Sequence, residues 1–181
     1  MPTVVSDAGP LIHLAQIRQL HQLKKLFGVV LLTEKVKFEA GDEGFRLGYS
    51  DAGGIAAALE DEWLKVEPFP QRLVASAVKL AQAENISRAD AETLLLAVEK
   101  KSELLTDEKL LSTLAKMYGL HVWSTWTLLL EALSRNYIVL GEVDIAVEEL
   151  GKRKFRLNAK QTQDILDAAR FIDKRKKNNN S

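Results

Sequence analysis

The chain has 181 residues, of which 46% are hydrophobic and 28% are charged, a balance that excludes a wholly disordered or a fibrous protein. Its 25 basic and 25 acidic residues cancel, so a protein that coats nucleic acid through bulk positive charge is excluded, and any such contact must be local. The absence of cysteine excludes disulfides, thiolate zinc sites and a cysteine nucleophile.

The predicted elements begin with a βαβ unit. Residues 4–5 and 28–32 are short aliphatic runs, typical of buried parallel strands, and we expect them to be neighbours in one sheet. Between them, Pro10 opens a helical stretch with apolar residues at every third position up to Leu26. The rest of the chain is predicted, in order, as a helix from 34 to about 42, a glycine-rich loop over 43–54, a helix over 55–62, a strand over 64–69, helices over 73–83 and 89–100, a strand over 104–106, a helix over 109–118, a strand over 121–123, and helices over 125–134, 143–149 and 159–174.

Strands separated by helices predict an α/β fold with a central parallel sheet of about four to five strands flanked by helices. We expect a main domain over residues 1–150, a C-terminal helical extension over 151–175 and a disordered polar tail over 176–181. The extension carries an apolar side that the sheet does not need, so we expect it to pack on a second protomer of a homodimer or to close over the fold. That side consists of Ile165, Leu166, Ala169 and Ile172.

Two acids lie where the ligand crevice of a parallel sheet is expected, directly after strands. Asp7 follows residues 4–6, and Asp107 follows residues 104–106, with Glu108 beside it. If the two strands are adjacent and parallel, the two carboxylates converge. Converging carboxylates repel each other unless a hard divalent cation neutralises them, and oxygen ligands favour Mg²⁺ or Mn²⁺ over zinc.

Two further acids on helices could join this site, Glu39 and Asp90. Asp90 and Glu92 are two residues apart, about 200° around a helix, so they cannot both face one site. Asp90 shares its stripe with Leu94, which faces the sheet in the predicted packing. Asp90 is therefore the better candidate of the two.

Each of these acids also has a structural interpretation. Residues 87–90 match a capping box, in which Asp90 would bond to the backbone of Ser87. Asp7 could satisfy backbone amides before Pro10, and Asp107 or Thr106 could cap the following helix. Glu39 lies among charged neighbours and could be solvated. The functional interpretation therefore depends on the four acids as a set.

The set resembles the PIN-domain family, and in particular its VapC-like subgroup of toxin ribonucleases. The similarity lies in the segments Val-Val-Ser-Asp-Ala-Gly-Pro-Leu-Ile (4–12), the helix with Glu39, Ala-Asp-Ala-Glu-Thr-Leu-Leu-Leu-Ala (89–97) and Leu-Leu-Thr-Asp-Glu (104–108). The resemblance implies a PIN-like fold in which Asp7, Glu39, Asp90 and Asp107 are catalytic and Asp7, Asp90 and Asp107 bind Mg²⁺ or Mn²⁺. In this subgroup the third acid often lies in a Gly-Glu-Ala-Glu context, so Glu92 could replace Asp90. At the fourth position this chain has both Asp107 and Glu108, so Glu108 could replace Asp107.

The resemblance further implies a cytoplasmic Mg/Mn-dependent endoribonuclease, a hydrolase that acts on RNA and serves as the toxin of a type II toxin–antitoxin pair with an antitoxin protein as partner. A cytoplasmic, membrane-free protein also agrees with the N-terminal residues, which lack a signal-peptide pattern, and with apolar runs too short to span a bilayer. Two alternatives stay open. One is a scaffold that keeps the PIN fold and binds RNA or protein without turnover, and the other is a phosphatase or another small α/β hydrolase that uses the same carboxylate–metal chemistry.

Overall fold

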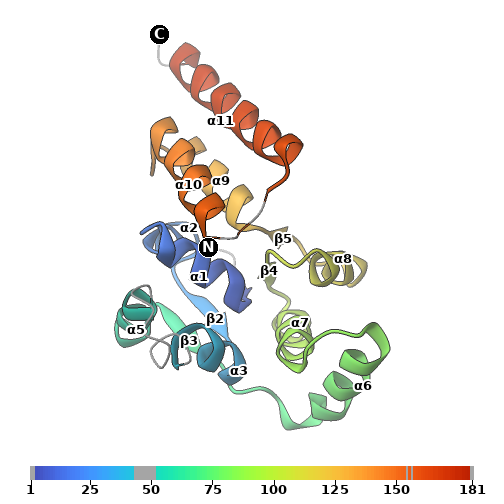
Figure 1. Ribbon diagram of the computed structural model, residues 1–181. Helices are drawn as coiled ribbons and strands as arrows, with labels where there is room; N and C mark the ends of the chain where they lie inside the picture. Colours follow the sequence, from blue (N-terminus) through green and yellow to red (C-terminus); the bar gives the residue numbers. More distant parts are fainter. Residues whose placement is uncertain (1–2, 43–51, 154, 156, 180–181) are drawn as a thin grey trace. The chain divides into compact units, whose positions relative to one another are not determined.

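The computed structural model describes residues 3–42, 52–153, 155 and 157–179 (Figure 1). The chain divides into two compact units, Met1–Ser124 and Thr125–Ser181. The division lies at Ser124, whereas the sequence led us to expect a boundary near residue 150. The helices over 125–134 and 140–152 contact the C-terminal helix, so they belong to the second unit.

The described part of the first unit forms a five-stranded sheet with the order β3-β2-β1-β4-β5, in which every neighbouring pair is parallel. The strands are short and rich in valine and leucine, as expected for strands covered on both faces. The pairing of β1 with β2 confirms that residues 4–5 and 28–32 contribute neighbouring strands. The strands are β1 (Val4–Ser6), β2 (Val30–Leu32), β3 (Leu64–Val66), β4 (Glu103–Leu105) and β5 (Val122–Trp123).

Helices flank this sheet, so the predicted α/β class is confirmed (Figure 1). The core that the site depends on lies where β1 and β4 pack against two helices, through residues that include Val5, Leu94, Leu104 and Leu111. The helices of the first unit are α1 (Ala8–Gln16), α2 (His21–Phe27), α3 (Glu34–Lys37), the π-helical turn η1 (Phe38–Asp42), α5 (Ala52–Glu60), the 3₁₀ turn η2 (Gln71–Leu73), α6 (Val74–Glu84), α7 (Arg88–Lys100) and α8 (Lys109–Met117).

Two segments of the first unit differ from the sequence prediction. The helix expected from 34 to 42 is α-helical only to Lys37 and then becomes the π-helical turn η1. In the expected glycine-rich loop over 43–54, residues 43–51 lie outside the described residues, and the remaining three begin helix α5. Glycine lowers helix propensity, but Ile55 is fully buried and the tertiary packing of this helix outweighs the propensity of its first turn.

The second unit consists of the helices α9 (Thr125–Ser134), α10 (Leu140–Lys152) and α11 (Ala159–Asn179), which contact one another. Ala169, on the apolar side of α11, is completely buried, so this side packs on α9 and α10 of the same chain. Trp126 stacks on Phe155 with ring centroids 5.5 Å apart, which makes this tryptophan part of the packing.

The expected disordered tail is wrong for residues 176–179, because α11 continues through them. Lys177 forms an i,i+4 ion pair with Asp173, and the ammonium group of Lys176 donates a hydrogen bond of 2.7 Å to the carbonyl of Leu133 in α9. Positive side chains also interact favourably with the C-terminal end of a helix dipole. No helix among the described residues is long and apolar enough to cross a membrane.

Candidate active site

Asp7 occupies the carboxyl end of the central strand. Its backbone N–H donates to the carbonyl of Leu105 at 2.9 Å, so the residue extends the pairing of β1 with β4 and then caps helix α1. One carboxylate oxygen accepts from the Ala8 N–H at 2.6 Å, and the other accepts from the Thr106 hydroxyl at 3.1 Å. Only 5% of the residue is exposed. The expected capping role is therefore real, and it fixes the orientation of this carboxylate.

The charge of Asp7 is strongly disfavoured in the fold. The pKa of its carboxyl group is raised from 3.8 to about 7, first by burial and then by the negative charges of Asp90 and, to a lesser extent, Glu39. The hydrogen bonds from Ala8 and Thr106 act in the opposite direction but do not compensate. Because charges act on a buried group at short range, Asp7, Asp90 and Glu39 form one electrostatic cluster.

Asp90 has two roles at the start of α7. Its N–H donates to the Ser87 hydroxyl at 3.0 Å, and its carboxylate accepts from the Ser87 N–H at 3.3 Å, which is the predicted capping box. The side chain is half-buried and at the same time acts on the carboxylate of Asp7. Capping therefore holds Asp90 in place without removing it from the cluster.

Glu39 lies in the π-helical turn η1 and is exposed. A π-helical turn widens the helix locally and shifts the side chains that follow, and such turns are frequent at functional sites. Of the acids in the cluster, Glu39 is the one most open to solvent and so the one most able to reach a water molecule or a substrate.

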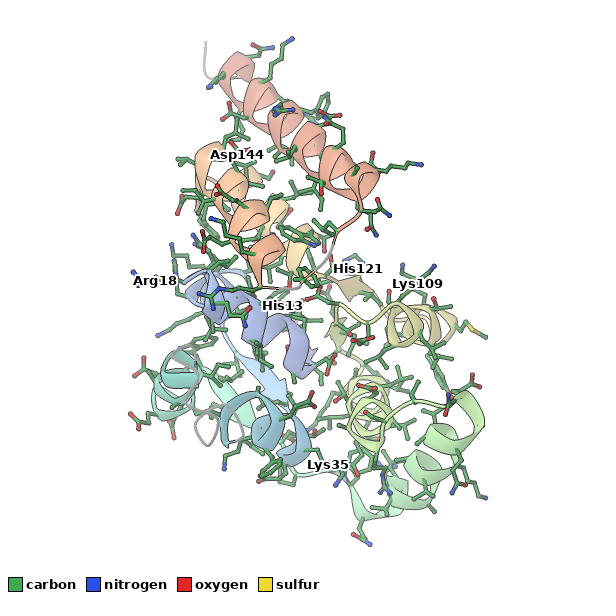
Figure 2. The ribbon with its side chains drawn as sticks, in the orientation of Figure 1. His13, Arg18, Lys35, Lys109, His121 and Asp144 are labelled. Carbon is green, nitrogen blue, oxygen red and sulfur yellow. The ribbon has the colours of Figure 1, made fainter. Side chains whose placement is uncertain are left out.

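Asp107 reaches the same edge of the sheet from β4, the strand next to β1. One of its carboxylate oxygens lies 2.7 Å from Nδ1 of His13 on α1, and its side chain is only 7% exposed. Figure 2 labels His13 on this helix. Asp7 and Asp107 therefore lie at one end of the sheet, as expected, and His13 holds the carboxylate of Asp107 there.

Sequence reasoning missed His13, because its spacing matches no metal-ligand motif. Its partner Asp107 lies 94 residues away in the sequence, so no local pattern indicates the contact.

The two alternative acids have different environments. Glu92 is buried between cations, with Arg88 Nε 2.9 Å and Lys35 Nζ 3.9 Å from its Oε1 atom. It is more deeply buried than Asp90, which the helical stripe did not predict, because these two cations compensate its charge. Glu108 is exposed at the N-cap of α8, where its backbone N–H donates to the Thr106 hydroxyl at 3.1 Å.

The chemistry of this donor set fits a hard divalent cation. All four acids supply oxygen ligands, and the repulsion that raises the pKa of Asp7 is the kind that such a cation relieves. As placed, though, no three His, Asp or Glu side chains among residues 3–42, 52–153, 155 and 157–179 lie close enough to hold one ion. Binding would therefore require side-chain rotation.

The fold and the site together define an α/β protein with a parallel sheet and with acidic residues at the carboxyl ends of its central strands. A family model described as a PIN domain (DUF3368) matches residues 3–170, and the chain belongs to this family, whose members are typically nucleases. The family expected from the sequence is thus confirmed, while nothing distinguishes its VapC-like subgroup.

Two solved structures share the fold. PAE2754 from Pyrobaculum aerophilum is 21% identical, with a TM-score of 0.54 over 72% of this chain and 88% of its own. A PilT N-terminus domain protein, SSO1118 from Sulfolobus solfataricus P2, is 19% identical, with a TM-score of 0.50 over 72% of this chain and 93% of its own. No curated protein matches this chain in sequence. At these identities the two structures show the fold alone.

Proposed function

We propose that this protein is a Mg²⁺- or Mn²⁺-dependent endoribonuclease that hydrolyses RNA phosphodiester bonds at the carboxyl edge of its sheet. The observation that carries the proposal is the buried carboxyl group of Asp7, whose pKa is raised to about 7 beside Asp90 and Glu39. Repulsion between carboxylates opposes folding, and groups with strongly shifted pKa values cluster at functional sites.

In this proposal Asp7, Asp90 and Asp107 hold the cation. When bound, the cation supplies positive charge at the scissile phosphate and lowers the pKa of a water molecule. Thr106 and Ala8 fix the orientation of Asp7, and His13 fixes that of Asp107. Glu39, the exposed acid, orients the attacking water and accepts its proton.

The alternative is a PIN-fold scaffold without turnover. A specific observation favours it: Asp7 and Asp90 both cap helices, and the described acids are not assembled around one point. A scaffold would keep these residues for stability alone. The two functions therefore predict different results when the carboxylate of Asp7 is replaced by an amide of the same shape. A nuclease would lose activity, whereas a scaffold would have none to lose and would keep its binding.

The decisive experiment is cleavage of a mixed pool of RNA with Mn²⁺, with Mg²⁺ and with chelator. We expect metal-dependent cleavage by the wild type and a loss of orders of magnitude in Asp7→Asn. The companion variant is Glu108→Gln, which removes an exposed carboxylate one residue from Asp107. Retained activity would support Asp107 as the ligand, and lost activity would assign that role to Glu108. Chelator-insensitive cleavage, or full activity of Asp7→Asn, would rule out a metal-dependent nuclease at this site. Hydrolysis of p-nitrophenyl phosphate with the RNA left intact would support the phosphatase.

The resemblance to VapC-like toxins extends the proposal to a biological role, in which the protein is the toxin of a type II pair. Its expression should then arrest growth, and co-expression of a small protein encoded next to it should restore growth and copurify with it. Growth arrest that persists in Asp7→Asn would show that the effect does not depend on RNA cleavage.

A further inference from the structure

Two cations lie beside the acid cluster and share one buried carboxylate. Arg88 begins α7 two residues before Asp90, and Lys35 lies in α3 four residues before Glu39. Both face Glu92, whose side chain is 8% exposed. The contact of α3 with α7 brings them together, and Figure 2 labels Lys35 on α3 next to α7.

The pairing of these charges is incomplete. Arg88 Nε lies 2.9 Å from the carboxylate of Glu92 but without the alignment of a hydrogen bond, and Lys35 is a looser partner at 3.9 Å. Within the part of the chain that the structure describes, neither cation has another protein partner. Two cations thus face the single carboxylate of Glu92, next to the acids of the cluster. The side chains of Lys35 and Arg88 are 46% and 33% exposed, so both can be reached from solvent.

We propose that Lys35 and Arg88 form a binding site for an RNA backbone phosphate next to the phosphate that is cleaved. The proposal rests on the proposed ribonuclease function. The unpaired terminal N–H groups of a guanidinium match a phosphate in a bidentate manner, and the lysine adds a mobile point charge. Glu92 then acts as a positioning residue that keeps both cations beside the acids, which would otherwise repel the strand.

This assignment gives Glu92 a role although the proposed function does not place it on the metal. Its buried charge is compensated by the two cations, which link the first turn of α7 to α3. These are the elements that carry Asp90 and lead into Glu39. The same ion pairs therefore serve to set the distance between the acids and the phosphate site.

The test is the salt dependence of RNA binding, measured by anisotropy of a labelled single-stranded RNA in chelator, so that nothing is cleaved. Each phosphate contact contributes about 0.7 to the slope of log K against log salt for a single strand, or roughly fivefold in affinity between 1 M and 0.1 M salt. We expect Lys35→Met to lose one such contact. Lys37→Met, two residues along the same helix and facing elsewhere, should leave the slope unchanged.

Arg88→Lys gives an independent result, because it keeps the charge but removes the planar fork, and it should weaken binding with little change in slope. An unchanged slope in Lys35→Met alongside unchanged affinity in Arg88→Lys would overturn the proposal, as would equal competition by polyglutamate, which would assign the site to acidic protein partners. If the slope changes while the wild type cleaves no RNA, the phosphate site stands and the nuclease function fails. If cleavage is metal-dependent and the slope is unchanged, the nuclease function stands and the phosphate site fails.

Discussion

Replacing Asp7 with asparagine should stabilise the protein in a manner that depends on pH. The pKa of the Asp7 carboxyl group is about 7 in the folded state against 3.8 for an unperturbed group. The folded state therefore binds the proton more tightly than the unfolded state, and the free energy of unfolding of the wild type falls as the pH rises from about 4 to about 7. Asparagine does not titrate and lacks this contribution.

The magnitude follows from the size of the shift. The shift is about three pKa units, and each unit corresponds to about 1.4 kcal/mol. The free energy of unfolding of Asp7→Asn relative to the wild type should therefore rise by at most roughly 4 kcal/mol between about pH 4 and pH 7. Asparagine keeps the acceptor for the Ala8 N–H, but its amide group must face the Thr106 hydroxyl, which already accepts from the Glu108 N–H. This rearrangement costs about 1 kcal/mol. It lowers the free energy of unfolding of Asp7→Asn by the same amount at every pH.

The assay is urea unfolding of wild type and Asp7→Asn from pH 4 to pH 8 in chelator. Ionisable groups remote from Asp7 contribute equally to both proteins and cancel in the difference, which reports the charge of Asp7 together with its coupling to Asp90 and Glu39. We expect Asp7→Asn to gain stability relative to the wild type up to about pH 7 and the gain then to level off. A difference that is the same at pH 4 and pH 8 would refute the reasoning, because the buried charge would then have no energetic consequence.

Three further outcomes are expected. His13→Gln should lower the free energy of unfolding by about 1–3 kcal/mol, since it weakens the contact with the carboxylate of Asp107, whereas His121→Gln on the exposed side should change it much less in the same denaturant titration. Leu94→Ala should lower it by about 2–5 kcal/mol, because this fully buried side chain leaves a cavity in the core beneath the site, and a change below 1 kcal/mol would show that the core collapses around it. Deletion of the residues after Asn158 removes α11 and exposes the sides of α9 and α10 on which it packs, so size-exclusion chromatography should show a larger mass or loss of soluble protein, and an unchanged, equally stable monomer would contradict this.

The sequence is sufficient for the features of the fold and site that depend on local patterns. Asp7 and Asp107 directly follow aliphatic strands, and the pairing of β1 with β4 brings their backbones to one edge as expected. The capping box at Ser87 and Asp90 is also local, because it needs only residues three apart. Such features are fixed by spacing and strand direction, both of which can be read along the chain.

The missed features depend on contacts between distant segments. His13 meets Asp107 across 94 residues, and Glu92 is buried because Lys35 reaches it from another helix. No periodicity in either segment indicates these partners. The π-helical turn at Glu39 was missed for a related reason, since its residues are compatible with an α-helix and the extra residue per turn is set by the surrounding packing.

The position of β1 at the centre of the sheet constrains how the protein is made on the ribosome. Its neighbour β2 is available early in synthesis, but its other neighbour β4 lies about one hundred residues later in the chain. Until that strand emerges, one edge of β1 is unpaired and Asp7 lacks both its backbone partner Leu105 and the hydroxyl of Thr106. The acidic cluster is therefore assembled only after more than half of the protein has been translated, so the early part of the nascent chain lacks the completed site.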